Sequence, residues 1–158
     1  MEKTVINGEI NVLVPDGFAV MDREELARVY KKDNDRFWGM KKTGSPEEGI
    51  YVIVDWEDYN PLVLMLLSAK DIARRNEQIH AGVYADYGYR KGTVFERTVC
   101  GRKAAGYRFS YSVKGKDLRA SSILFKHGSR VYKFTCAADT ADETAGPVFE
   151  SFLDSAAF

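Results

Sequence analysis

Residues 105–113 read AGYRFSYSV, and this stretch decides the fold class of the chain. From Tyr107 to Val113 every second residue is apolar or aromatic, and the residues between them are polar. Successive side chains of a strand point to opposite faces, so this alternation is typical of a strand with one buried face. The sequence therefore predicts a β-strand in the middle of the second half of the chain.

Three more stretches of the second half predict strands joined by short turns. Residues 92–100 come before the central strand, across the link 101–104. Residues 118–127 and 130–137 predict a hairpin around Gly128-Ser129. Because neighbouring strands that are joined by tight turns run antiparallel, we expect four consecutive antiparallel strands.

The first half mixes strands and helices. Alternating or continuous apolar residues predict strands over 9–14, 36–42 and 50–57, and the link 43–49 has the composition of a loop. Asp22, followed three residues later by Glu25, predicts a capped helix start. The apolar stripe of this helix is expected at Leu26, Val29 and Tyr30.

The start of the second helix has two possible positions. Asn60-Pro61 predicts a start with Pro at the first helical position, and Ser68 with Asp71 predicts a later one. In either case the helix is expected to end by Gly82. Pro147 is expected to open a closing helix with Phe149, Phe152, Leu153 and Ala156 on one face. The expected order is β-α-β-β-α-β-β-β-β-α.

Length and composition indicate one globular domain over residues 1–158. The chain is 45% hydrophobic and 29% charged, as in ordinary globular proteins. Its 23 basic and 23 acidic side chains cancel. Since general nucleic-acid binders carry a basic excess, we expect no nucleic-acid partner.

Four segments together resemble the PsbP-like and Ran-binding Mog-like superfamily. They are residues 14–18 (VPDGF), 101–107 (GRKAAGY), 128–135 (GSRVYKFT) and 149–158 (FESFLDSAAF). The first is similar to the strand-ending v-P-x-G-F of that superfamily, and the last to its closing F-x-x-i-l-x-S-f-x-f. The order of the expected elements matches over nearly the whole chain.

The resemblance implies an α+β fold, a three-layer α/β/α sandwich with a central, mainly antiparallel sheet of about six to seven strands. It implies no shared chemistry, because the relatives include photosystem accessory proteins, Ran-binding proteins, bacterial lipoproteins and chaperones of secretion effectors. This chain has no acidic cluster that matches a Ran-binding surface, so that role is not transferred.

The N-terminal residues and the cysteines favour the cytoplasm. No basic region followed by an apolar one marks a secretory signal. The longest apolar run, residues 62–67, is too short for a membrane span of about 20 residues. A mature exported protein without its leader would share these features. In the cytoplasm, Cys100 and Cys136 are expected to be reduced.

The two histidines predict structural roles. His80 falls at the expected end of a helix, where a positive imidazolium would complement the helix dipole. His127 falls at a hairpin turn and is expected to be exposed. Because the chain has neither His-x-x-x-His nor Cys-x-x-Cys, the sequence predicts no metal site and no cofactor.

Asp55, Glu57 and Asp58 form the densest carboxylate group of the chain. Asp55 and Glu57 share one face of an expected strand, which is the spacing of an acid pair or a weak cation site. The alternative interpretation is the polar end of a strand that enters a loop, and it is the one that the sequence favours.

The segment between the second helix and the next strand is the candidate binding surface. It carries Tyr84, Tyr87, Tyr89, Arg90 and Lys91. Tyrosine and arginine are enriched at binding hot spots, and loops on a rigid scaffold often carry function. The alternative is that these tyrosines pack the loop onto the sheet.

These observations favour a non-catalytic protein-interaction or accessory module with an unidentified protein partner. The alternative is a chaperone or carrier that shields an apolar peptide or a small ligand. A hydrolase that uses Asp55 and Glu57 is a third and weaker possibility. We therefore expect that the chain is not an enzyme.

Overall fold

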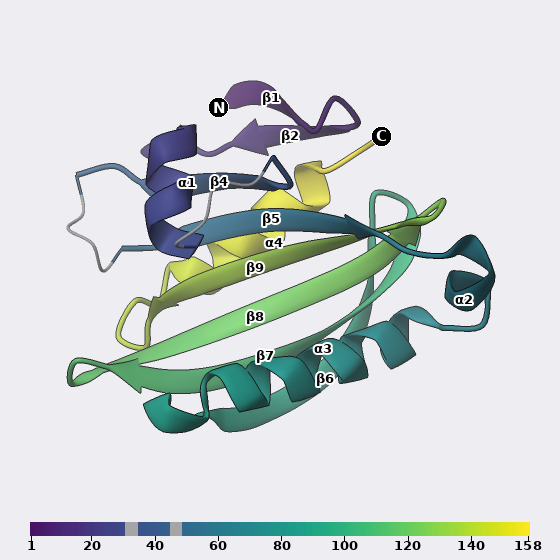
Figure 1. Ribbon diagram of the computed structural model, residues 1–158. Coiled ribbons are helices and arrows are strands. Elements are labelled where there is room, and N and C mark those ends of the chain that lie inside the picture. Colours follow the sequence, from purple (N-terminus) through teal and green to yellow (C-terminus); the bar gives the residue numbers. More distant parts are fainter. Residues whose placement is uncertain (31–34, 45–48) are drawn as a thin grey trace.

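The computed structural model describes residues 1–30, 35–44 and 49–158. Within these residues, seven strands form one antiparallel sheet (Figure 1). From one edge to the other they are β3 (Phe18–Val20), β4 (Phe37–Lys42), β5 (Tyr51–Asp58), β9 (Arg130–Asp139), β8 (Lys116–His127), β7 (Arg102–Val113) and β6 (Arg90–Val99). The four strands of the second half are consecutive antiparallel neighbours, as predicted.

Helices cover both faces of the sheet (Figure 1). One face carries α1 (Arg23–Tyr30) and α3 (Ala69–Val83). The other face carries α4 (Ala145–Ser155) and the hairpin of β1 (Glu2–Ile6) and β2 (Ile10–Val14). The predicted α+β sandwich with a mainly antiparallel sheet is therefore confirmed.

Side-chain caps fix the helix starts that the sequence predicted. At α1 the Asp22 carboxylate accepts a hydrogen bond from the Glu25 amide (2.8 Å), and the Glu25 carboxylate accepts one from the Asp22 amide (3.4 Å). The side chains of Val29 and Tyr30, two members of the predicted stripe, lie outside the described part of the chain. So does most of the predicted loop 43–49.

Both candidate starts of the second helix exist, because the segment forms two helices. Asn60 caps the short α2 (Pro61–Met65) by accepting from the Leu62 amide (2.9 Å). Ser68 then caps α3 in a reciprocal capping box with Asp71. The Ser68 hydroxyl accepts from the Asp71 amide at 3.1 Å, and the Asp71 carboxylate accepts from the Ser68 amide at 3.0 Å. The helix ends at Val83, one residue beyond the predicted limit.

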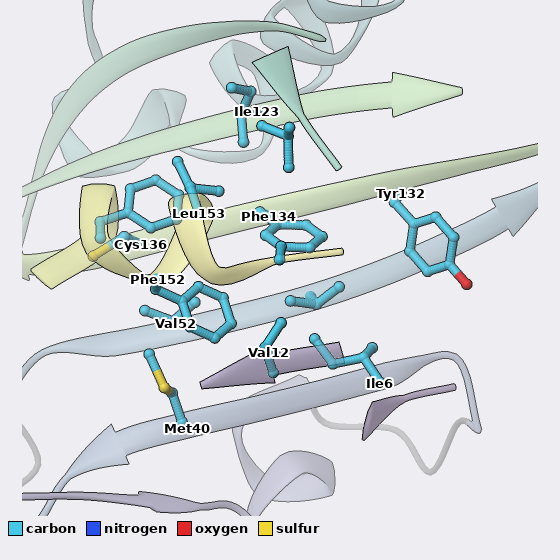
Figure 2. Close-up of a cluster of buried hydrophobic side chains, with 14 of the residues drawn as sticks. Ile6, Val12, Met40, Val52, Ile123, Tyr132, Phe134, Cys136, Phe152 and Leu153 are labelled. Atoms are coloured by element: carbon cyan, nitrogen blue, oxygen red, sulfur yellow. The ribbon is translucent and has the colours of Figure 1, made fainter. Parts of the chain in front are cut away.

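The larger core lies between the sheet and α4 (Figure 2). Because strand side chains alternate, Val52 and Val54 of β5 point to this face. The apolar face predicted for α4 is buried against them: Phe149, Phe152, Leu153 and Ala156. The helix begins at Ala145, two residues before the predicted Pro147.

The sequence analysis missed two strands, so the predicted element order was incomplete. β1 and β3 are absent from it. β1 pairs with β2 across Asn7-Gly8, whose positive φ values of 52° and 67° are those of a tight hairpin turn. β3 has only three residues, too few for a pattern. β6 begins at Arg90 rather than at residue 92, with an irregular register between Lys91 and Val94.

Candidate functional site

An aromatic cluster occupies the face of the sheet under α3. The alternation in β7 places Tyr107, Phe109 and Tyr111 on this face, and α3 sets His80 and Tyr84 against them. The His80 ring lies 5.1 Å from the Phe109 ring and 5.6 Å from the Tyr107 ring, between centroids. The Tyr107 hydroxyl lies 2.5 Å from Nδ1 of His80. These contacts give the end of α3 a rigid base.

His80 is neutral at physiological pH, contrary to the expected imidazolium. Burial, and secondarily the positive charge of Lys133, lower its pKa to about 4. The prediction was wrong because it considered only the helix end and not the aromatic side chains beneath it. His127 is likewise more than an exposed turn residue, since its ring stacks on Phe158 with centroids 4.0 Å apart.

Tyr84 and Tyr89, two of the predicted site residues, pack the segment onto the sheet. The Tyr84 ring stacks on Tyr111, with centroids 4.6 Å apart. The Tyr89 ring stacks on Phe109 at 5.6 Å, and its hydroxyl donates to Oε1 of the buried Glu77 at 2.8 Å. Burial and the Glu77 carboxylate raise the pKa of Tyr89, so it stays a neutral donor. For Tyr84 and Tyr89, the observed geometry agrees with the alternative interpretation, in which the tyrosines pack the loop onto the sheet.

The other three predicted residues are exposed. Tyr87 lies in the single 3-10 turn η1 (Ala85–Tyr87), keeps 48% of its surface accessible, and contacts Tyr84 edge-on at 6.3 Å. Arg90 and Lys91 are exposed at the start of β6, so they belong to a strand and not to a loop. The structure therefore gives a fixed part, Tyr84 and Tyr89, and an accessible part, Tyr87, Arg90 and Lys91.

A cavity of about 320 Å³ adjoins the aromatic cluster at Tyr111. Its walls are mostly apolar, and its lining includes Tyr51, Val113 and Leu118, with Lys114 and Lys116 also present. A cavity of this size matches the lower range of small-molecule sites. The arrangement has room for a small apolar group with a negative charge near the lysines.

In the structure, Asp55 and Glu57 contact different polar partners. Asp55 lies 3.5 Å from Nζ of Lys133. Glu57 accepts a hydrogen bond from the Tyr59 hydroxyl at 2.9 Å.

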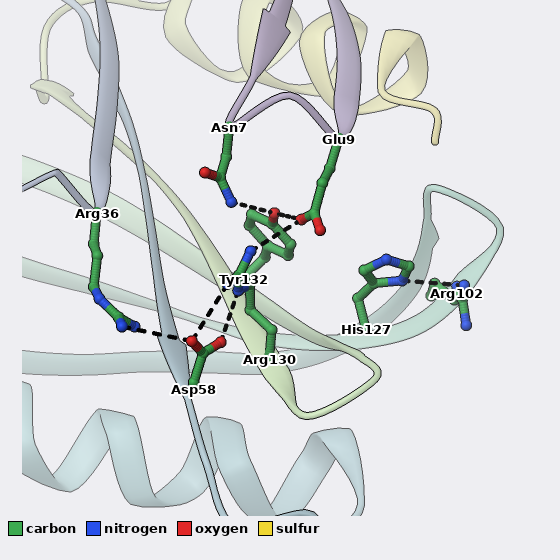
Figure 3. Close-up of polar contacts among 8 residues, drawn as sticks. All are labelled: Asn7, Glu9, Arg36, Asp58, Arg102, His127, Arg130 and Tyr132. Atoms are coloured by element: carbon green, nitrogen blue, oxygen red, sulfur yellow. Dashed lines mark hydrogen bonds and ion pairs between the residues drawn. The ribbon is translucent and has the colours of Figure 1, made fainter.

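Asp58, the third carboxylate, belongs to a polar network that joins the β1-β2 hairpin to the sheet (Figure 3). Arg130 donates to Asp58 (2.8 Å) and to Glu9 (3.3 Å), and its hydrogen bond holds the pKa of Asp58 below the ordinary value. The Tyr132 hydroxyl donates to Glu9 and accepts from Asn7 at 3.1 Å. The sequence analysis missed this network because these hydrogen bonds join residues that are 72 to 125 positions apart.

Within the described residues, no three or more His, Cys, Asp or Glu side chains gather in a way that would hold a metal ion. Both cysteines are free thiols, as expected. Burial raises the pKa of Cys100 to about 11 and that of Cys136 to about 12. Neither thiol is therefore prepared as a nucleophile.

The sequence matches no family model and no curated protein, whereas the fold matches solved structures. LpqN of Mycobacterium tuberculosis, described as involved in cell envelope biogenesis, superposes with a TM-score of 0.64 at 15% identity, over 99% of this chain and 90% of that one. Cyanobacterial PsbP (CyanoP) from Synechocystis sp. PCC 6803 superposes with a TM-score of 0.67 at 13% identity, over 98% and 90%.

The chain has the PsbP-like fold. The resemblance read from the four segments is thereby confirmed as a likeness of fold. A third match, a Bacteroides thetaiotaomicron protein, has a TM-score of 0.59 at 7% identity over 94% of this chain and 44% of that one. At these identities the PsbP-like fold assigns no role to any residue.

One exposed feature of this PsbP-like chain received no role in the sequence analysis. Leu62, Met65 and Leu66, in and just after α2, keep 72–85% of their surface accessible. The sequence signal was present as the apolar run 62–67, which was considered only as a membrane span. None of the helices in the described ranges is long and apolar enough to cross a membrane.

Proposed function

We propose that this chain is a non-catalytic protein-binding module whose working surface consists of Tyr87, Arg90 and Lys91. The observation that carries this proposal is the difference between packed and exposed tyrosines within residues 84–91. Tyr84 and Tyr89 are fixed on the sheet by ring stacking, while Tyr87 stays accessible and contacts Tyr84 edge-on. A tyrosine held in this way offers a large contact area at a low cost in conformational entropy.

The charges of the surface indicate the chemistry of the partner. In the described part of the chain, neither Arg90 nor Lys91 has an ion-pair partner, and both are exposed. One acidic side chain, Asp86, lies nearby in η1 and is also exposed. The partner that fits best is a protein that offers an apolar pocket for Tyr87, flanked by carboxylates.

Two further observations support this assignment. Asp55, Glu57 and Asp58, the carboxylates considered for catalysis, contact separate polar partners. The two free thiols are consistent with a reducing compartment, and we propose the bacterial cytoplasm as the place of action.

The test is capture of partners from a native lysate by immobilised protein, compared between two variants. Tyr87→Ala with Arg90→Ser and Lys91→Ser should lose a stoichiometric protein that the wild type retains. The matched control is Val94→Ser with Lys3→Ser, which changes exposed positions on β6 and β1, outside the proposed surface. Equal capture by wild type and triple variant would contradict the proposal.

The cavity beside Tyr111 supports a second candidate, a carrier of small apolar anions. Its volume of about 320 Å³ and its apolar walls with Lys114 carry this alternative, whereas Lys116 is paired with Asp139 at 3.7 Å. Fluorescence titration with anilinonaphthalene sulfonate tests it. Saturable binding that Leu118→Trp abolishes by filling the cavity would favour the carrier, and no saturable binding would remove it.

A further inference from the structure

The segment Tyr59–Leu67, here called the α2 knob, contains the helix α2, which lies at one end of the molecule (Figure 1). Leu62, Met65 and Leu66 are 72%, 78% and 85% exposed, and Val63 is 47% exposed. Single exposed apolar residues are common on proteins, but several adjacent ones indicate a contact surface.

The knob is held rigidly, so this exposure does not come from a loose segment. Leu64 is 3% exposed and packs with Ala69 and Ile72 of α3. From the other side, the Lys126 ammonium donates to the carbonyl oxygens of Leu64 (3.2 Å) and Leu67 (2.7 Å). The base of the knob, with Leu64 and the partly buried Leu67, is thus fixed on the protein, and Leu62, Met65 and Leu66 stay exposed.

Part of the backbone of the knob is hydrogen-bonded within the protein. The amide of Leu62 donates to the Asn60 side chain (2.9 Å), that of Leu66 to the Val63 carbonyl (3.1 Å), and that of Leu67 to the Leu64 carbonyl (3.2 Å). The two carbonyl groups bound by Lys126 further reduce the number of backbone groups that need water, which lowers the cost of bringing the knob to an apolar medium.

Basic side chains lie beside the knob, and acidic ones flank it: Asp58 and Asp71 stand directly before and after residues 59–70, and Glu57 accepts a hydrogen bond from the Tyr59 hydroxyl. Residues 59–70 contain no Asp or Glu. A hollow beside the knob is lined by Ser68 and by Lys70, Lys103 and Lys126, with Glu96 as its one acidic side chain in the described residues. Tyr59, 41% exposed at the start of the knob, is of the residue type that prefers the boundary between lipid and water.

We propose that the α2 knob docks this protein on an anionic lipid bilayer, with Leu62, Met65 and Leu66 at the acyl boundary and Lys70 and Lys103 among the headgroups. A convex apolar group with a cationic rim fits a bilayer, because lipids adapt to its shape and anionic headgroups complement its charge. A protein groove would require a shape that matches the knob, which a fluid bilayer does not.

This docking does not rest on the proposed protein-binding surface. The knob precedes α3, whereas Tyr84 caps its other end, and 15 helical residues separate the two by about 22 Å. The two surfaces can therefore be changed separately, and a protein partner at Tyr87 would be presented at the membrane.

Co-sedimentation with vesicles tests the proposal. The full chain is mixed with vesicles of phosphatidylcholine alone or of phosphatidylcholine and phosphatidylglycerol at 7:3. We expect binding to the anionic vesicles that exceeds binding to the neutral ones. Leu62→Ser with Met65→Ser and Leu66→Ser should lower the partition coefficient by about a hundredfold, because the variant no longer buries these three apolar side chains in the bilayer.

The matched control is Ile79→Ser with Val83→Ser, which removes two apolar side chains that are 62% and 61% exposed on α3. This control should bind anionic vesicles like the wild type, and Lys70→Ser with Lys103→Ser should weaken binding most at low salt. Wild-type protein that stays in the supernatant with both vesicle types would overturn the proposal. The proposal would also be overturned if the wild type formed a concentration-dependent dimer instead of binding vesicles, and if the knob variant abolished that dimer. The surface that covers the knob would then be a second copy of the chain.

Discussion

The ring of Trp38 in β4 lies nearly parallel to the ring of Phe152 in α4, with centroids 5.7 Å apart and 8° between the planes. Phe152 also contacts Phe134 of β9 at 5.9 Å. Because β5 lies between these two strands, one side chain ties α4 across three strands of the sheet. The C-terminal helix is therefore part of the core and not an appendage.

Replacing Phe152 with Ala should lower the free energy of unfolding by about 3–5 kcal/mol, since the side chain is fully buried and its loss leaves a cavity. Urea unfolding measures this change. Ser151→Ala, at the exposed neighbouring position, is the control and should shift the midpoint little. An unchanged midpoint for Phe152→Ala would mean that α4 is not docked.

Tyr89→Phe should destabilise the protein by about 1–3 kcal/mol, because it leaves the Glu77 carboxylate buried without the hydroxyl that donates to it. Tyr87→Phe makes the same chemical change at an exposed position and should stay within about 0.5 kcal/mol of wild type. Equal effects of the two substitutions would contradict the division between fixed and exposed tyrosines.

The pKa of about 4 for His80 predicts a loss of stability in mild acid. The folded value lies below the ordinary 6.5, so the unfolded chain binds the proton more tightly. The contribution of His80 is complete above pH 6.5 and is lost as the pH falls to about 4. Over this window the free energy of unfolding should fall by about 3 kcal/mol, because a pKa difference of one corresponds to about 1.36 kcal/mol.

Unfolding measured at several pH values checks this prediction. The decrease between pH 7 and pH 4 should be smaller in His80→Gln than in the wild type, whatever the absolute stability of the variant. NMR titration of the His80 ring with an apparent pKa near 6.5 would contradict the account.

Both cysteines should react slowly with Ellman's reagent at pH 8 in the native protein, because burial keeps the thiols protonated. Protein denatured without reductant should release two thiols per chain. A count of zero would contradict the assignment of free cysteines and the proposed reducing compartment together.

The sequence predicted those elements whose side chains alternate or cap locally. β7 alternates cleanly, and Asp22 and Ser68 cap helices through residues three positions away, so local patterns sufficed. β1 was missed because Ile6 is its one buried residue, although Asn7-Gly8 is a known hairpin signal. β3 owes its existence to pairing with β4, which no local pattern reports.

The sequence indicated the segment that carries the candidate site, but not which of its tyrosines are packed and which are exposed. Tyr84, Tyr87 and Tyr89 are equivalent in the sequence. What separates them is Tyr111 beneath one ring and Glu77 beside another, residues that only the folded sheet brings near. The lowered pKa of His80 has the same origin in distant aromatic neighbours.

Photo-crosslinking from position 87 tests the central claim most directly. Benzoylphenylalanine replaces Tyr87 in the full chain, and a second protein carries it at Val94, an exposed position of β6. After irradiation in native lysate, we predict one discrete protein adduct from position 87 and none of that mass from position 94. The same adducts from both positions, or no adduct from position 87, would contradict the claim that Tyr87 is the contact point of a protein-binding surface.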